Sequence, residues 1–258
     1  MAASLQGRRI VITRAREQAG DLARALEACG AVTVIAPVIR IQPLENLGAL
    51  RAALTGLSTY RWVVFTSQNA VQIVFDRLVA WGLTPRVFST TSVAAIGTAT
   101  AEALTLRGVV PALVPEEFVA ESLAEAMIRQ SGTLAGARVL IPTAEDAREL
   151  LATTLRQHGA EVETMTVYRT VPVQTDLSGL AADIRGGRID AVTFTSSSTV
   201  RSFVELVGRA AATSAGFVAA TIGPVTAGTA RELGLRDVIE ADPHTVRGLV
   251  DALARRFG

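Results

Sequence analysis

The sequence predicts an α/β protein built from two similar doubly wound parallel-sheet domains. The chain has 258 residues, which is enough for two domains of ordinary size. Short apolar segments alternate with amphipathic ones along its length, as expected for parallel strands joined by helices. Several motifs also occur twice. The repeated pairs are 7–14 with 136–143, 63–67 with 192–196, and 95–101 with 221–227.

The repeat has a long period. The first two pairs are 129 residues apart (136 minus 7) and the third is 126 apart (221 minus 95). Solenoid units are far shorter, so a solenoid is excluded. We interpret the repeat as two copies of one α/β unit, with a cleft between the two domains where a ligand binds.

The first copy begins with a strand, a helix and a second strand. Residues 9–13 form a short apolar run typical of a buried parallel strand. Residues 17–29 carry Leu22 and Leu26 at helical spacing, and Gly30 follows as a stop signal. The second strand, 32–36, ends at a proline.

The remaining elements follow from the same patterns. The other expected strands are 62–65, 93–96, 112–114, 138–141, 161–167, 191–194 and 217–222. The other expected helices are 47–57, 70–80, 98–106, 120–129, 144–158, 177–185, 199–210, 225–233 and 246–257. The acidic pair at 145 and 146 is expected in the first turn of its helix.

Two proline-bearing stretches, 37–43 and 166–173, are candidate linkers because they occupy the same place in each copy. The midpoint, 133–136, is also loop-like. The pattern leaves two arrangements open. The domains are either consecutive in the chain or exchange their N-terminal strand–helix–strand segments.

The composition excludes several function classes. There is no lysine, which removes the P-loop lysine and Schiff-base chemistry. Two histidines and one cysteine do not make a conventional zinc site, and no Gly-x-Gly or Gly-x-Ser-x-Gly motif occurs. The balance of 25 basic and 24 acidic residues argues against nucleic-acid binding. The single cysteine and the absence of a signal peptide or long apolar run favour a cytoplasmic protein that does not bind membranes.

Four hydroxyl-rich clusters fall where strands end and helices begin. They are 66–69, 97–100, 195–199 and 223–226. Ligands of open α/β sheets bind at this edge, and the first-turn amides of a helix suit an anion. Each cluster alone is also explained by ordinary helix capping. Arg14 is either a surface residue or a carboxylate ligand, and Tyr168 either packs its ring or presents its hydroxyl to a ligand. Cys29, His158 and His244 are interpreted as structural.

Six motifs in sequence order resemble the uroporphyrinogen-III synthase family. They are Gly7-x-x-Ile-Val-Ile-Thr-Arg14, Phe65-Thr-Ser-x-Asn-Ala-Val71, Ile96-Gly-x-x-Thr-Ala101, Val167-Tyr-Arg-Thr170, Phe194-Thr-Ser-Ser197 and Ile222-Gly-x-x-Thr-Ala227. The similarity extends along the whole chain.

The resemblance implies two α/β domains joined by a two-stranded linker. One domain would comprise 1–38 with 172–258, and the other 39–171. It also implies an enzyme that uses neither cofactor nor metal, cyclising hydroxymethylbilane, a linear tetrapyrrole with eight carboxylates, to uroporphyrinogen III. Water is lost and ring D is inverted. We expect a monomer.

The resemblance and the clusters together suggest the site residues. Tyr168 is the candidate catalytic residue, donating a hydrogen bond or proton to the leaving hydroxyl. The candidate substrate-binding residues are Arg14, Ser67, Gln68, Asn69, Thr98, Thr100, Ser196, Ser197, Ser198 and Thr226. Two rival functions stay open: a non-catalytic two-domain ligand-binding or sensor protein, and an unrelated α/β enzyme acting on a phosphorylated metabolite.

Overall fold

Two compact units make up the protein in the computed structural model, which describes residues 5–117, 119–147, 149–214 and 216–258. Unit 1 comprises residues 1–40 and 171–258, and unit 2 comprises residues 41–170. The expected domains have nearly the same bounds, and their status as separately folding domains stays a prediction. Among the described residues, no helix is long and apolar enough to cross a membrane.

Unit 1 contains a five-stranded sheet in the order β10-β9-β8-β1-β2, and every pair in it is parallel. Its strands are β1 (Arg9–Ile12), β2 (Val32–Ile35), β8 (Ala191–Phe194), β9 (Val218–Thr221) and β10 (Asp237–Glu240). Ile10 of β1 pairs with Ala191 of β8. The N-terminal strand–helix–strand segment therefore completes a sheet with the end of the chain, and the two copies of the repeat exchange these segments.

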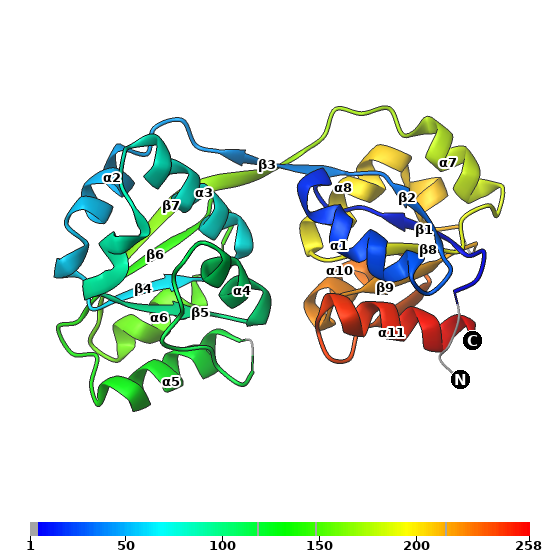
Figure 1. Cartoon of the computed structure of the whole chain (residues 1–258). Helices are drawn as coiled ribbons and strands as arrows, with labels where there is room; N and C mark the ends of the chain where they lie inside the picture. The colour runs from blue at the N-terminus through cyan, green and yellow to red at the C-terminus, as the bar shows by residue number, and fades with distance from the viewer. Residues whose placement is uncertain (1–4, 118, 148, 215) are drawn as a thin grey trace. The chain divides into compact units, whose positions relative to one another are not determined.

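Helices cover both faces of this sheet (Figure 1). They are α1 (Arg16–Glu27), α7 (Ser178–Arg185), α8 (Ser197–Val207), α9 (Arg209–Ala212), α10 (Pro224–Glu232) and α11 (Val246–Phe257). Ile10 and Ile12 lie in one core with α1 and α11, whereas Val11 lies in another with α7 to α10. Alternate strand residues point to opposite faces, so one short apolar run fills both cores.

Unit 2 contains the second sheet, in the order β3-β7-β6-β4-β5. Its strands are β3 (Ile39–Pro43), β4 (Trp62–Phe65), β5 (Ser92–Ala95), β6 (Arg138–Ala144) and β7 (Glu161–Pro172). The helices are α2 (Gly48–Thr55), α3 (Gln68–Ala80), α4 (Thr98–Leu106), α5 (Ala120–Ser131) and α6 (Leu150–Gln157), with 3-10 turns at Leu57–Thr59 and Pro85–Thr90. Helices α2 to α4 cover one face, and α5 and α6 cover the other.

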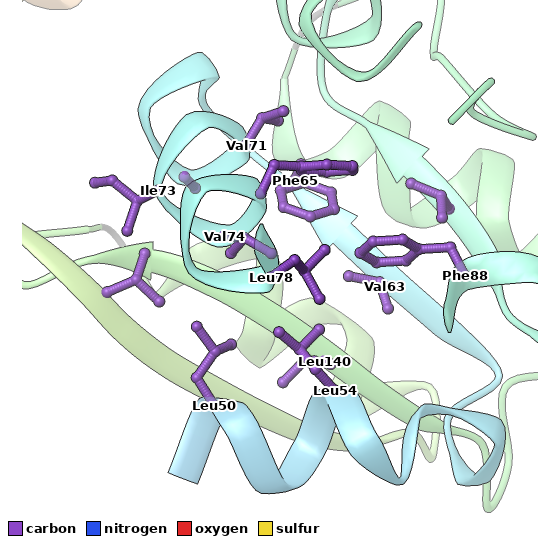
Figure 2. Packing of buried hydrophobic residues seen from close by; sticks show 14 of the residues in the cluster. Leu50, Leu54, Val63, Phe65, Val71, Ile73, Val74, Leu78, Phe88 and Leu140 are labelled. Carbon is purple, nitrogen blue, oxygen red and sulfur yellow. The ribbon is translucent and has the colours of Figure 1, made fainter. Parts of the chain in front are cut away.

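Figure 2 shows how one face of this sheet is filled. Leu54 of α2 and Leu78 of α3 point toward Val63 of β4 and Leu140 of β6. All four side chains are at most 1% exposed. Burying a leucine of this kind contributes roughly 1.5–3 kcal/mol, so these contacts fix the strands whose ends carry the candidate site.

The chain passes between the units along β3 and β7. The amide of Val173 donates to the carbonyl of Val38 in unit 1, and the amide of Leu44 donates to the carbonyl of Val167 in unit 2. Residue numbers fall along one strand as they rise along the other, so the two strands are antiparallel. The stretches 37–43 and 166–173 are thus largely strand rather than loop.

Four sequence predictions need correction. The expected helix 144–158 begins only at Leu150, because β6 continues to Ala144 in register with β7, and the acidic pair at 145 and 146 precedes the helix. The expected helix 199–210 breaks at Gly208, whose φ of 82° leaves the helical region. The expected strand 112–114 is one bridge, between Leu113 and Ala94, and the strand β10 was not expected at all.

Candidate functional site

The side chains of Ser67 and Tyr168 meet at the N-terminus of α3 in unit 2. Ser67 follows β4 and is the N-cap of α3, where its hydroxyl oxygen accepts a hydrogen bond from the amide of Ala70 at 3.1 Å. The hydroxyl oxygen of Tyr168 lies 3.1 Å from that of Ser67. Residues 101 apart in sequence thus place two hydroxyl groups at one strand end.

The backbone around Tyr168 is fixed on both sides. Its carbonyl accepts a hydrogen bond from the amide of Glu145, and the carbonyl of Val167 accepts one from Leu44. The register of β6 and β7 shifts just here, where Ala144 pairs with Tyr168. The tyrosine is 6% exposed and belongs to the core beneath α2 to α4. A buried ring with its hydroxyl at the edge of the core is a rigid way to present one polar group.

Unit 1 repeats the serine but not the tyrosine. Ser196 is the N-cap of α8 and accepts from the amide of Thr199 at 3.3 Å, while Thr199 bonds back to the Ser196 backbone in a capping box. The Ser196 hydroxyl also lies 2.8 Å from that of Ser198. The residue aligned with Tyr168 by the repeat is Ile39, which is buried in the core. Only unit 2 therefore carries a phenol at this place.

In each unit a second helix begins beside the helix that the serine caps: α4 beside α3, and α10 beside α8. Helix α4 has Gly97 as its N-cap and α10 has Gly223, both with extended backbone and without a side-chain cap. No capping side chain competes for the first-turn amides there, and such amides bind anions. The third residues of the two helices, Thr100 and Thr226, are each 5% exposed.

Side chains connect the two helix starts within each unit. In unit 2, Gln68 Nε2 donates to the carbonyl oxygen of Ala99 at 3.1 Å. In unit 1, the Ser197 hydroxyl donates to the carbonyl oxygen of Val225 at 3.5 Å. Capping explains Ser67 and Ser196, but it does not explain these contacts between helices.

Arg14 follows β1 in unit 1, and its guanidinium is incompletely satisfied. Among the described residues, its Nε is one of two buried side-chain nitrogen or oxygen atoms without a hydrogen-bond partner; the other is Ser214 Oγ. Burial lowers the pKa of Arg14, and the charge of Asp21 partly offsets this. Because β1 and β8 are neighbours, Arg14 and Ser196 lie at adjacent strand ends. This is the topological switch point of the sheet, where ligands of such folds bind.

The structure thus groups the expected site residues within each unit. Unit 2 holds Tyr168, Ser67, Gln68, Asn69, Thr98 and Thr100, and unit 1 holds Arg14, Ser196, Ser197, Ser198 and Thr226. All of them lie at carboxyl strand ends or in the first turn of a helix, apart from Tyr168, which lies within β7.

Two residues near the site were missed by the sequence reasoning. Thr229, buried in α10, donates its hydroxyl hydrogen to the Ser197 hydroxyl at 2.8 Å, and its oxygen also lies 3.1 Å from the Val225 carbonyl oxygen. Its position one turn after Val225 was the available signal. His244 precedes α11, as expected, but its ring also lies against Gly223, and a Cβ on that glycine would come 3.4 Å from the ring.

The hollow found in unit 1 does not involve the expected site residues. A hollow of about 600 Å³ in unit 1 is lined by Arg40, Val171, Pro172, Val173, Gln174, Glu205 and Leu206, none of them an expected site residue. Within the described part of the chain, no three His, Cys, Asp or Glu residues are placed to hold a metal ion.

Comparison with known proteins identifies relatives along the whole chain. The sequence profile described as uroporphyrinogen-III synthase HemD matches residues 20–251. The uroporphyrinogen-III synthase of Synechococcus elongatus is 33% identical, over 96% of this chain and 95% of that protein. The porphyrin biosynthesis protein HemD of Ruminiclostridium josui is 31% identical over 98% of this chain, but the chain spans only about half (49%) of that protein.

Solved structures with the same fold also exist. A mutant uroporphyrinogen III synthase from Thermus thermophilus superposes with a TM-score of 0.63, covering 96% of this chain and 98% of that one. The two sequences are 20% identical. This likeness supports the two-domain α/β fold.

Proposed function

This chain belongs to the uroporphyrinogen-III synthase family, and on that premise we propose that it converts hydroxymethylbilane to uroporphyrinogen III. In this reaction water leaves the linear tetrapyrrole, the ring closes, and ring D is inverted. The observation that carries the proposal is the match to the family along nearly the whole chain. The paired helix N-termini described above are consistent with a substrate that carries eight carboxylates.

The chemistry of this reaction demands orientation more than strong acid catalysis. The pyrrole nitrogen of ring A expels the hydroxyl group, and the free substrate closes spontaneously to the type I isomer. The enzyme must therefore hold the chain so that the substituted carbon of ring D is attacked. Binding groups that fix such a geometry accelerate one path over the other.

We propose that the first turns of four helices bind the acetate and propionate groups. Helices α4 and α10 offer first-turn amides without a side-chain cap. Because Pro224 has no N–H, α10 offers the amides of Val225 and Thr226, whereas α4 offers those of Thr98, Ala99 and Thr100. Hydrogen bonds to charged groups are worth about 1.5–3 kcal/mol each, so several amides suffice without a basic surface.

The first turns of α3 and α8 would act in the same way. Gln68 and Asn69 follow the N-cap of α3, and Ser197 and Ser198 follow that of α8. Ser67 and Ser196 would define where each helix starts, and their hydroxyls are already used in capping. These residues would contribute mainly through their backbone amides.

Arg14 and Tyr168 are proposed to act through their side chains. The unpartnered Nε of Arg14 suits a substrate carboxylate, which would supply the missing acceptor. The Tyr168 hydroxyl would donate a hydrogen bond or a proton to the hydroxyl that leaves ring A. Ser67 would hold it in place, since the two oxygens are 3.1 Å apart.

The test is to supply enzymatically made hydroxymethylbilane, oxidise the products and separate the isomers. Type III product that increases with protein concentration supports the proposal. Type I product alone contradicts it. The same assay separates the enzyme from a non-catalytic ligand-binding or sensor protein, which would bind the tetrapyrrole and quench tryptophan fluorescence without altering the isomer ratio.

We further propose a cytoplasmic monomer. A single cysteine cannot form a disulfide within the chain, which agrees with a reducing compartment. Sedimentation equilibrium measures the mass directly, with about 27.1 kDa expected for one chain.

A further inference from the structure

The two units tie their helix starts together by the same kind of contact, made with different residues. In both, the first residue of one helix reaches the carbonyl of the second residue of the neighbouring helix. Gln68 of α3 reaches Ala99 of α4, and Ser197 of α8 reaches Val225 of α10. Neither serves as an N-cap, since Ser67 and Ser196 hold those positions. N-terminal capping of the helices therefore does not account for these contacts.

We call this contact between two helix starts the tie. The two units make it with side chains of different length, and unit 1 adds a further residue to its shorter side chain. Glutamine is long enough to span the gap in unit 2 alone. Serine is short, and its bond to Val225 is 3.5 Å long. Unit 1 adds Thr229, whose hydroxyl donates to Ser197 at 2.8 Å. The repeat aligns Thr229 with Ala103, which has no hydroxyl.

We propose that Gln68 and Ser197 are positioning residues, tying the paired helix starts at the spacing that one substrate carboxylate requires. This rests on the proposed function. Each carbonyl they contact also accepts an amide inside its own helix, and the second lone pair takes the side chain. The tie therefore fixes one first turn against the next without using the outward-facing amides. A carboxylate that bonds to both helices then finds its donors already placed.

Three variants test the tie, with kcat, KM, isomer ratio and unfolding measured for each. Gln68→Met keeps the volume of the side chain and removes its donor. We expect KM to rise about two- to tenfold, as for the loss of one hydrogen bond, with kcat nearly unchanged. Ser197→Ala should raise KM by a smaller factor because its bond is longer, and Ser197→Thr, which restores the hydroxyl, should return KM toward the wild-type value.

Thr229→Val separates a tie from a direct substrate contact. The hydroxyl hydrogen of Thr229 is already used in its bond to Ser197, so the tie places Thr229 behind Ser197 and not in direct contact with the substrate. The tie predicts that Thr229→Val raises KM, and that adding it to Ser197→Ala changes nothing further, because both remove one contact. A direct contact by Ser197 predicts no effect of Thr229→Val.

Thr105→Val is the matched control, since it removes a hydroxyl bond to the Ala101 carbonyl at the far end of α4. KM should stay at the wild-type value. If wild type makes type III product while Gln68→Met and Thr229→Val both keep its KM, this inference fails alone. If they lower only the free energy of unfolding, the contacts are purely structural and it fails as well. Wild type that yields only type I product overturns the proposed function itself.

Discussion

Replacing Tyr168 with phenylalanine removes one oxygen atom and leaves the ring in its buried place. The lost contact is a single neutral hydrogen bond to Ser67, and Ser67 keeps its bond from the amide of Ala70. The free energy of unfolding should therefore fall by only about 0.5–1.5 kcal/mol. The variant should fold normally.

The effect on turnover should be larger. A hydrogen bond to a group that gains charge in the transition state is worth about 1.5–3 kcal/mol, which corresponds to a kcat lower by roughly 10- to 150-fold. KM should change little, because the carboxylates bind elsewhere. Initial rates of type III formation, measured at saturating substrate, give kcat.

Tyr60, the other tyrosine in the chain, provides the matched control. It precedes β4, whereas Ser67 follows that strand, so its hydroxyl lies at the opposite edge of the sheet. There it bonds to Glu163 and accepts from Arg138. Tyr60→Phe should reduce stability and leave kcat intact. A Tyr168→Phe kcat within twofold of wild type would refute the reasoning, as would an equal loss in both variants.

Four further outcomes are expected. Arg14→Met should raise KM about tenfold or more while leaving the free energy of unfolding equal or higher, because it removes a half-buried charge whose buried Nε has no hydrogen-bond partner. Phe203→Ala should cost about 3–5 kcal/mol in urea unfolding, since the ring is fully buried. Gly248→Ala should lower the melting temperature of the protein, because the new Cβ would lie 1.9 Å from the Pro243 carbonyl oxygen. Burial and the bond to Glu163 raise the pKa of Tyr60. Its stabilising effect should therefore be full below the ordinary tyrosine value of about 10 and disappear as pH rises through the folded-state value. Unfolding of wild type and Tyr60→Phe between pH 8 and 11 checks this.

The cores of both sheets were predictable from the sequence because each central strand is a short apolar run. Strand β8, for example, is buried at all four positions and was expected at its observed bounds. Strand β10 was missed because its four residues are only half-buried and two of them are acidic. The signal in the sequence was a run of apolar residues, and in β10 that run is only two residues long.

The helix expected at 144–158 was wrong at its start because strand pairing outweighs the local preference of these residues for helix. Alanine and glutamate favour helix, yet Ala144 continues β6 because β7 beside it extends to Pro172. The sequence placed the hydroxyl clusters at strand ends correctly. It could not place Tyr168 against Ser67, because that contact depends on a register shift between β6 and β7. The roles of the site residues stay predictions.

The exchange of strand–helix–strand segments also sets an order of events during synthesis. Strands β1 and β2 leave the ribosome first, but β8, the other partner of β1, is made only after the last residue of unit 2. Unit 2 can therefore complete its sheet while β1 of unit 1 still lacks its partner strand β8. A released chain truncated after residue 175 should protect 41–170 from protease and leave 5–36 cleavable.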